Sequence, residues 1–251
     1  MFIINFILKY IAAFGKYLEL MGRTFSIPER MRMFMKQYVK EMAQLGVDSI
    51  GIVLLISFFI GAVICIQIKL NIQSPWMPNF TTGYTTREIM VLEFSSSIMC
   101  LILAGKVGSN IASEIGTMRV TQQIDALEIM GVNSASFLIL PKILGLMTMI
   151  PFLVVFSIVA GFIGAYATAF AGIITPDDLT VGLLHSFVPW FVWMSIIKSI
   201  FFAFIIASVS SYYGYNVQGG SFDVGKASTN AVVSSSMLIL FADIFLTQLL
   251  S

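Results

Sequence analysis

The chain has 251 residues, of which 58% are hydrophobic and 11% are charged, and its formal net charge is +1. A soluble domain carries about a quarter charged residues, so this composition, with a mean hydropathy of +0.93, excludes one. The near-neutral charge does not favour nucleic-acid binding, and long unbroken apolar runs exclude the alternating pattern of a β-barrel. The sequence therefore predicts an all-α polytopic membrane protein.

Residues 1–46 are predicted to form interfacial or cytoplasmic helices. Lys9, Lys16 and Arg23 recur every seven residues and share one helical face, while apolar residues fill the opposite face. This pattern is typical of an amphipathic helix that lies in the membrane interface. Pro28 suits the start of a second helix, whose basic residues also favour the cytoplasmic side.

Residues 47–251 contain five apolar segments near or above the roughly twenty residues that a bilayer requires. They lie at about 48–68, 87–107, 137–171, 187–210 and 229–250. The third exceeds one span, and Pro141 or Pro151 is its candidate kink. Lys and Arg are absent from the loops 71–86 and 172–184. The positive-inside rule therefore places the N-terminus and the loop between the second and third spans in the cytoplasm.

The longest polar stretch, residues 104–136, joins the second and third spans. Apolar residues recur at helical spacing in its second half: Val120, Ile124 and Leu127. They predict a short amphipathic helix at about 117–131. Thr117 or Thr121 is its predicted N-cap, and Gly131 is its predicted left-handed C′ residue. Such a helix either lies on the lipid surface or docks into a groove of another protein.

The segment AGKVGSNIASEIGTMRVTQQIDALEIMGV within this stretch resembles the signature of the MlaE (YrbE-like) permease family, the membrane subunits of lipid-transporting ABC systems. Lys106 replaces the usual Arg of that signature, and Gln122 replaces a usual Glu. The other positions of the family pattern match, and the resemblance extends from about residue 47 to the C-terminus. The resemblance implies that residues 47–251 form a five-span permease domain.

The resemblance also implies the partners and the activity. It implies a homodimer in the inner membrane of a double-membraned bacterium, bound by a cytoplasmic ABC ATPase and a periplasmic MCE-domain protein. The implied substrate is phospholipid, moved between the inner and outer membranes to maintain outer-membrane lipid asymmetry. The 117–131 helix is then a coupling helix for the ATPase, with these candidate coupling residues: Glu114, Arg119, Gln123, Asp125 and Glu128.

The chain carries no motif for chemistry of its own. It has no P-loop, no HExxH segment, no nucleophile elbow and no cluster of metal ligands in its sequence. We therefore expect a non-catalytic membrane subunit without a metal or cofactor of its own, served by a separate partner that hydrolyses ATP.

Glu93, Lys198 and Asp243 lie inside the second, fourth and fifth predicted spans. Such residues are candidates for a functional site because a charge in hydrocarbon is costly. Their depths below the outer surface, about 9, 16 and 10 Å at 1.5 Å per residue, allow them to meet. Lys198 and Asp243 are predicted to pair, which leaves Glu93 nearer the lipid. An ion triad that only fixes helix register is the alternative.

The resemblance further implies a lipid cavity at the dimer interface, open to the outside and lined by the first, second and fifth spans. Acyl chains need apolar walls, and a headgroup needs a few polar groups at the mouth. Charged positions of the family match the three intramembrane residues, although its RELGP segment reads LEFSS around Glu93. Gln67 matches a family pattern in the first span, and a plain interfacial residue is the alternative there. The candidate lipid-binding residues are Phe59, Val63, Gln67, Met90, Glu93, Phe94 and Leu240.

Two other classes of function stay open from the residues alone. One is an ion-coupled secondary transporter that uses Glu93, Lys198 and Asp243 as a proton relay, a class that usually has inverted repeats and broken helices. The other is a membrane scaffold that transports nothing. Co-purification of an ATPase favours the ABC permease over both.

Overall fold

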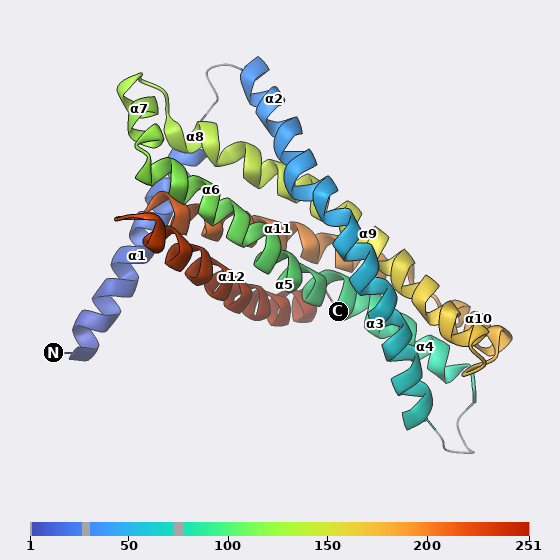
Figure 1. Cartoon of the computed structure of the whole chain (residues 1–251). Coiled ribbons are helices and arrows are strands. Elements are labelled where there is room, and N and C mark those ends of the chain that lie inside the picture. Colours follow the sequence, from blue (N-terminus) through green and yellow to red (C-terminus); the bar gives the residue numbers. More distant parts are fainter. Residues whose placement is uncertain (1, 27–30, 73–77, 251) are drawn as a thin grey trace. The chain divides into compact units, whose positions relative to one another are not determined.

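The structure is a computed structural model that describes residues 2–26, 31–72 and 78–250, with side chains from residue 11 onward. Every regular element within these ranges is helical (Figure 1). The α-helices are α1 (Phe2–Thr24), α2 (Met31–Glu41), α3 (Ile50–Asn71), α4 (Thr81–Ile89), α5 (Met99–Leu103), α6 (Ser109–Val120), α7 (Gln123–Ile129), α8 (Ser134–Leu138), α9 (Leu140–Phe170), α10 (Pro176–Leu184), α11 (Pro189–Tyr215) and α12 (Ser221–Leu250). Short π-helical or 3-10 turns are η1 (Met42–Gly46), η2 (Val47–Ser49), η3 (Met90–Ile98) and η4 (Ala104–Gly108). The helix start predicted at Pro28 lies outside the described residues.

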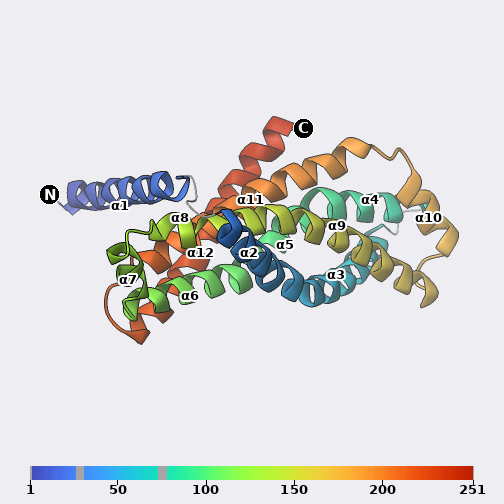
Figure 2. The same cartoon turned by 90° about the horizontal axis from the view of Figure 1, so that it is seen from above.

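The described residues contain five helical stretches that are long and apolar enough to cross a membrane: Met31–Asn71, Thr81–Val120, Ser134–Phe170, Pro189–Tyr215 and Ser221–Leu250. The predicted all-α fold with five spans is thereby confirmed. The second stretch begins at Thr81, whereas the polarity of the sequence predicts a start near residue 87. The Thr86 hydroxyl donates to the Thr82 carbonyl oxygen at 2.7 Å, so part of this polarity is satisfied within the helix. α4 also packs against α10, as both views show (Figure 1 and Figure 2).

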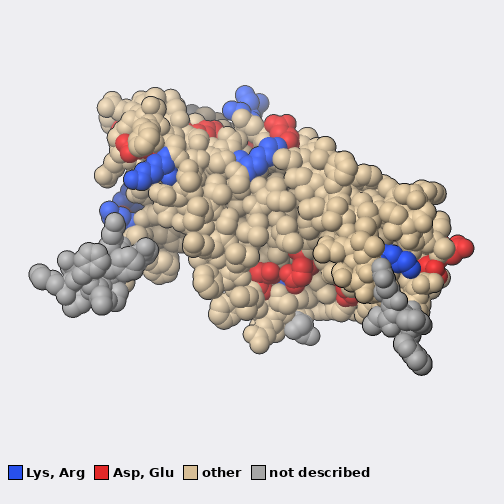
Figure 3. Space-filling view, turned by 60° about the horizontal axis from the view of Figure 1, so that its bottom comes forward, with Lys and Arg blue, Asp and Glu red and all other residues tan. Residues whose placement is uncertain are grey.

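The chain forms two compact units. The first unit comprises Met1–Ala43, Ala104–Leu146 and Phe204–Leu238, and the second comprises Gln44–Leu103, Met147–Ala203 and Ile239–Ser251. All Lys and Arg residues of the sequence except Lys69, Arg87 and Lys198 belong to the first unit. Most of the surface in Figure 3 belongs to neither basic nor acidic residues, as expected for helices that face hydrocarbon.

In the first unit, the end of α1 is attached to the segment before α8. Asn133 Nδ2 donates to the Arg23 carbonyl oxygen at 2.9 Å and to Ser26 Oγ at 2.7 Å. Asn133 Oδ1 accepts from the Ser136 N–H and so caps the start of α8. Ser136 Oγ donates to the Ser26 carbonyl oxygen at 2.9 Å. The N-terminal segment is thus joined to the chain that follows α7, while its place in the membrane interface stays a prediction.

The predicted helix at 117–131 is shorter than expected and is separated from α6 by a turn. Gln122 has a φ of 59° and occupies the N-cap position of α7. Thr117 and Thr121 are not caps, because their hydroxyls donate to carbonyl oxygens one turn back in the chain. Gly131 has a φ of 78°, which confirms the predicted left-handed residue after the helix. The turn at Gln122 therefore sets where α7 begins.

In the second unit, glycines let α3 and α9 pack backbone against backbone. A Cβ on Gly61 would overlap the carbonyl oxygen of Gly161, and a Cβ on Gly164 would overlap the carbonyl oxygen of Phe58. Such close approach is the usual role of small residues between membrane helices. These glycines therefore define a contact in which no side chain separates the two helices.

We expect Gly61→Ala to lower the temperature of half-unfolding of the purified protein. Alanine normally stabilises a helix interior by about 1 kcal/mol relative to glycine, but overlap with Gly161 costs about 1–3 kcal/mol. Gly51→Ala is the matched control, because α3 also contains Gly51 and no atom lies within 4 Å of a Cβ there. Equal melting of both variants would contradict the tight packing of α3 on α9.

The second span contains two π-helical turns, η3 and η4. Their i→i+5 hydrogen bonds widen the helix, and such turns are frequent at functional sites. The turn η3 carries Glu93 and also Ser95, whose Oγ accepts a hydrogen bond from Ser157 Oγ at 3.2 Å. Ser157 Oγ in turn lies 2.8 Å from Ser57 Oγ on α3. Hydroxyl groups thus link the wide turn to α9 and α3.

Candidate functional site

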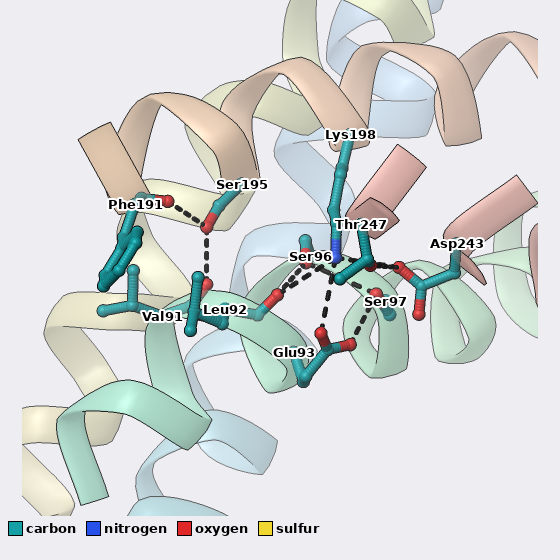
Figure 4. Close-up of polar contacts among 10 residues, drawn as sticks. All are labelled: Val91, Leu92, Glu93, Ser96, Ser97, Phe191, Ser195, Lys198, Asp243 and Thr247. Carbon is teal, nitrogen blue, oxygen red and sulfur yellow. Dashed lines mark hydrogen bonds and ion pairs between the residues drawn. The ribbon is translucent and has the colours of Figure 1, made fainter. Parts of the chain in front are cut away.

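A buried lysine brings two acidic side chains together in the second unit. Lys198 on α11 is fully buried, and its Nζ lies 3.0 Å from Asp243 Oδ1 on α12. The same Nζ lies 3.4 Å from Glu93 Oε1 in η3 (Figure 4). The predicted contact between Lys198 and Asp243 is therefore present, with Glu93 as a third member. Below, these three residues are termed the ion triad.

The members of the ion triad differ in exposure. The side chain of Lys198 is 0% exposed, that of Asp243 is 16% exposed and that of Glu93 is 46% exposed. Removing a charge from water is costly unless a close partner compensates it, so Lys198 depends on its acidic neighbours. Glu93 reaches the surface while it keeps contact with Lys198. It is the acid that an incoming molecule can reach.

Hydroxyl groups on the same helices support both acids. Ser97 Oγ donates to Glu93 Oε2 at 3.4 Å, and Thr247 Oγ1 donates to Asp243 Oδ1 at 3.4 Å. Each hydroxyl belongs to the residue four positions after the acid to which it donates. These hydroxyl groups fix the orientation of the two carboxyl groups relative to Lys198.

The backbone around the ion triad is held by a serine on α11. Ser195 Oγ lies 2.5 Å from the Val91 carbonyl oxygen and 2.9 Å from the Phe191 carbonyl oxygen, so its one proton is shared between these two acceptors (Figure 4). Lys198 Nζ also lies 3.5 Å from the Leu92 carbonyl oxygen. These hydrogen bonds hold α11 against η3 beside the triad. The position of Lys198 next to the second span therefore does not depend on its ion pairs alone.

The candidate lipid-binding residues fall into two groups. Met90 and Phe94 are 0% and 1% exposed, so they pack inside the protomer and do not form an exposed wall in this conformation. They flank Glu93 along the chain, but of these three residues only Glu93 reaches the surface. The exposed candidates are Phe59, Val63, Gln67 and Leu240. For these four, a role in binding lipid stays a prediction.

Four of the five candidate coupling residues lie on α7 or at the adjoining end of α6: Arg119, Gln123, Asp125 and Glu128. Arg119 Nη1 contacts Asp125 Oδ1 at 2.5 Å, and the Arg119 guanidinium lies 5.9 Å from the centre of the Tyr215 ring. Gln123 Nε2 donates to the Thr121 hydroxyl at 3.0 Å. Asp125 is held by Arg119, so α7 is fixed to the end of α6.

Glu128 lines a cavity of about 390 Å³ at the end of α7. Tyr215 Oη donates to Glu128 Oε1 at 2.8 Å, and Ser134 Oγ donates to the same oxygen at 2.9 Å. These two hydrogen bonds, that from Tyr215 first, lower the pKa of Glu128 below its ordinary value. The carboxylate therefore stays charged at neutral pH, next to Arg23 in the wall of the same cavity.

Comparison with known proteins gives the family. A family model described as "Permease MlaE" matches residues 38–249. The chain belongs to the MlaE permease family. A probable ABC transporter permease protein of Rickettsia bellii is 33% identical over 228 residues, which cover 88% of this chain and 85% of that protein.

Two further relatives extend the MlaE-family match to other lineages. The probable ABC transporter permease protein slr1045 of Synechocystis is 28% identical over 232 residues, which cover 92% of this chain and 88% of that protein. The chloroplastic protein TRIGALACTOSYLDIACYLGLYCEROL 1 of Arabidopsis thaliana is 29% identical over 211 residues, which cover 84% of this chain and 60% of that protein.

This MlaE-family permease has a second buried lysine that the sequence reading missed. Lys142 on α9 is 1% exposed, and its Nζ lies 2.8 Å from Glu41 Oε2 and 2.6 Å from Glu114 Oε2. Glu41 is 1% exposed and Glu114 is 28% exposed. Glu114, a candidate coupling residue, thus joins α6 to α2 and α9. Lys142 lies in an apolar predicted span, as Lys198 does, and the same signal would have found it.

The permease also buries an arginine that the sequence reading did not single out. Arg87 on α4 is 3% exposed and contacts Glu88 at 2.6 Å. Arg87 Nη1 donates to the carbonyl oxygens of Leu183 and His185 at 3.0 and 2.7 Å. Tyr84 lies beneath the guanidinium at 4.9 Å. The arrangement fastens the end of α10 to α4, because one guanidinium satisfies two carbonyl groups that the helix end leaves free.

Proposed function

We propose that this chain is the permease subunit of an ABC transporter that moves phospholipids between the inner and outer membranes and so maintains outer-membrane lipid asymmetry. The observation that carries the proposal is the ion triad within a five-span MlaE-family chain. It offers one accessible carboxylate at Glu93 on a surface that is otherwise apolar. A polar group in apolar walls is what a lipid headgroup and its acyl chains require.

The proposed substrate has a further support among the relatives. One of them carries the name of a glycerolipid, trigalactosyldiacylglycerol. Two others are named as probable permeases of ABC transporters. We therefore propose that the chain itself is non-catalytic, needs no cofactor and works with a partner that hydrolyses ATP.

The proposed assembly is a homodimer in the inner membrane with the N-terminus in the cytoplasm. The apolar part of α12 is only 11% buried within the protomer, which leaves a long face for a second copy and for lipid. Lys and Arg gather in the first unit, and the positive-inside rule supports a cytoplasmic position for it. An ABC ATPase would bind the surface around α7, and a periplasmic MCE-domain protein would receive or deliver the lipid outside.

The decisive test is co-purification from native membranes with an affinity tag on the full chain. We expect an ABC ATPase to co-purify and its hydrolysis to rise when phospholipid is added. Asp125→Lys should reduce both readouts by about tenfold or more, because it replaces the ion pair with Arg119 by two like charges on the proposed docking surface. Asp177→Lys, an exposed change on α10, is the control and should match the wild type.

Two outcomes would contradict the proposal. Absence of any ATPase from the wild-type pull-down would favour a secondary transporter or a scaffold. If Asp125→Lys co-purifies as much ATPase as the wild type, with the same rate of hydrolysis, α7 is not part of the coupling surface.

A further inference from the structure

The ion triad holds one cation and two acids. Lys198 is the only basic residue that pairs with Glu93 or Asp243 in the part of the chain that the structure describes. The other two basic residues of the second unit, Arg87 and Lys69, have different partners. With both acids ionised, the triad therefore carries one negative charge in excess.

Glu93 is the acid of the triad that Lys198 holds less closely. Asp243 is closer to Lys198, at 3.0 Å, and is less exposed than Glu93. Glu93 accepts one hydrogen bond from Lys198 on Oε1 and one from Ser97 on Oε2. A carboxylate offers about four lone-pair sites, so Glu93 has room for further donors on its exposed side.

The surface next to Glu93 is apolar. Ile89 and Ile98, four residues before and five after Glu93, are 39% and 43% exposed. In a π-helical turn with i→i+5 hydrogen bonds, residues at these spacings lie one turn away on the same side. Leu240, three residues before Asp243 on α12, is 52% exposed. An occupant of this surface must therefore bring a cation together with apolar chains.

The triad already shows which cation fits. The Lys198 side chain ends in an alkylammonium whose nitrogen lies 3.0 and 3.4 Å from the two acids. An ethanolamine headgroup ends in the same primary ammonium with three N–H donors. A choline headgroup is cationic but has no N–H, and a glycerol headgroup has no cation to offset its phosphate.

We infer that the ion triad selects phospholipids whose headgroup ends in a primary ammonium, with Glu93 as the residue that determines this specificity. The inference rests on the proposed function, since it concerns the headgroup of the transported lipid. The ammonium supplies the charge that the triad lacks, and the acyl chains cover the exposed isoleucine and leucine side chains. Anionic lipids without an amine are disfavoured, because their phosphate adds a second negative charge beside Glu93.

The test is a competition among lipids with identical palmitoyl and oleoyl chains. The full chain, purified with its co-purifying partners, is incubated with equal amounts of phosphatidylethanolamine, its N-monomethyl and N-dimethyl derivatives, phosphatidylcholine and phosphatidylglycerol. Bound lipids are then counted by mass spectrometry. We expect phosphatidylethanolamine to exceed phosphatidylglycerol by about tenfold, as one charge-assisted hydrogen bond allows. Binding should fall stepwise as methyl groups replace N–H donors.

Variants assign the selectivity to Glu93. Glu93→Gln should bring the ratio of bound phosphatidylethanolamine to bound phosphatidylglycerol near one. Glu93→Asp keeps the charge and should keep most of the preference. Asp177→Asn, which removes an exposed acid from α10, controls for net charge and should leave the ratio unchanged.

The outcomes separate this inference from the proposed function. Equal binding of all headgroups by the wild type overturns the inference but does not contradict lipid transport. A protonated Glu93 would give this result, because it would have no charge for an ammonium group to offset. A preference that survives Glu93→Gln also overturns it. Absence of any bound phospholipid contradicts the proposed function itself. If Glu93→Gln does not fold, the series of methylated lipids on the wild type still tests whether binding requires the N–H donors of a primary ammonium, and Glu93→Asp tests the role of the residue.

Discussion

Lys198→Met should destabilise the protein by about 3–5 kcal/mol, the usual cost of removing one partner of a buried ion pair. Lys198 is fully buried, and Asp243 is only 16% exposed. Without the ammonium, the Asp243 carboxylate stays in an apolar surrounding with no cation. The temperature of half-unfolding of the purified protein in detergent measures the effect.

A double-mutant cycle shows whether the effect belongs to the pair. Lys198→Met with Asp243→Leu should lose less stability than the sum of the two single variants, because neither charge is then left alone. Ser199→Ala is the control, since its hydroxyl bonds only to the Ile196 carbonyl oxygen of its own helix. A double variant that loses at least the sum would show that no stabilising contact exists. Glu93→Gln should stay near the wild-type temperature, because Glu93 is half exposed.

Lys142→Met should have an effect of similar size in the first unit. Glu41 is 1% exposed and would keep a buried charge without a cation, at a cost of about 3–5 kcal/mol. Replacing Glu41 with Gln in the same chain should recover part of the loss. Thermal unfolding measures both, and Lys40→Met, which changes an exposed lysine next to Glu41, is the matched control.

Glu114, the more exposed partner of Lys142, allows effects on stability to be separated from effects on coupling. Glu114 is 28% exposed, so Glu114→Gln should cost less stability than Lys142→Met. A loss with Lys142→Met no larger than that with Lys40→Met would show that the buried lysine does not depend on its two acids. Hydrolysis by the co-purified ATPase can then be compared between variants of equal stability, which separates folding from coupling.

The sequence predicts the membrane spans and the intramembrane charges well, because long apolar runs and charges within them are visible in its composition. Five apolar runs predict the spans, and the charges inside those runs predict the contact between Lys198 and Asp243, because an intramembrane charge requires a partner. The third member of the triad, Glu93, is predicted to lie apart from that pair. The contact of Lys142 with Glu41 could not be read in the same way. The two residues are 101 positions apart, and Glu41 lies outside every predicted span. Only the packing of α2 on α9 shows that this acid is buried.

The local geometry of the second span could not be predicted from the sequence either. The family resemblance and the need for apolar walls put Met90 and Phe94 among the candidate lipid-binding residues, whereas in the π-helical turn η3 both are buried within the protomer. Regular periodicity does not predict an extra residue in one turn of a helix. The start of the second span was misplaced for a related reason. Thr82 and Thr86 look like loop residues by polarity, yet they lie within α4.

The attachment of α1 through Asn133 has a consequence for work on the N-terminal segment. Deleting that segment would remove more than a membrane anchor. Asn133 would lose its bonds to the Arg23 carbonyl oxygen and to Ser26 Oγ, just beyond the helix to which the ATPase is proposed to dock. A truncated chain would then fail as a docking platform even when it is correctly inserted in the bilayer. The N-terminal segment therefore also fastens the chain between α7 and α8, and single substitutions at Asn133 can remove these bonds while α1 stays in the chain.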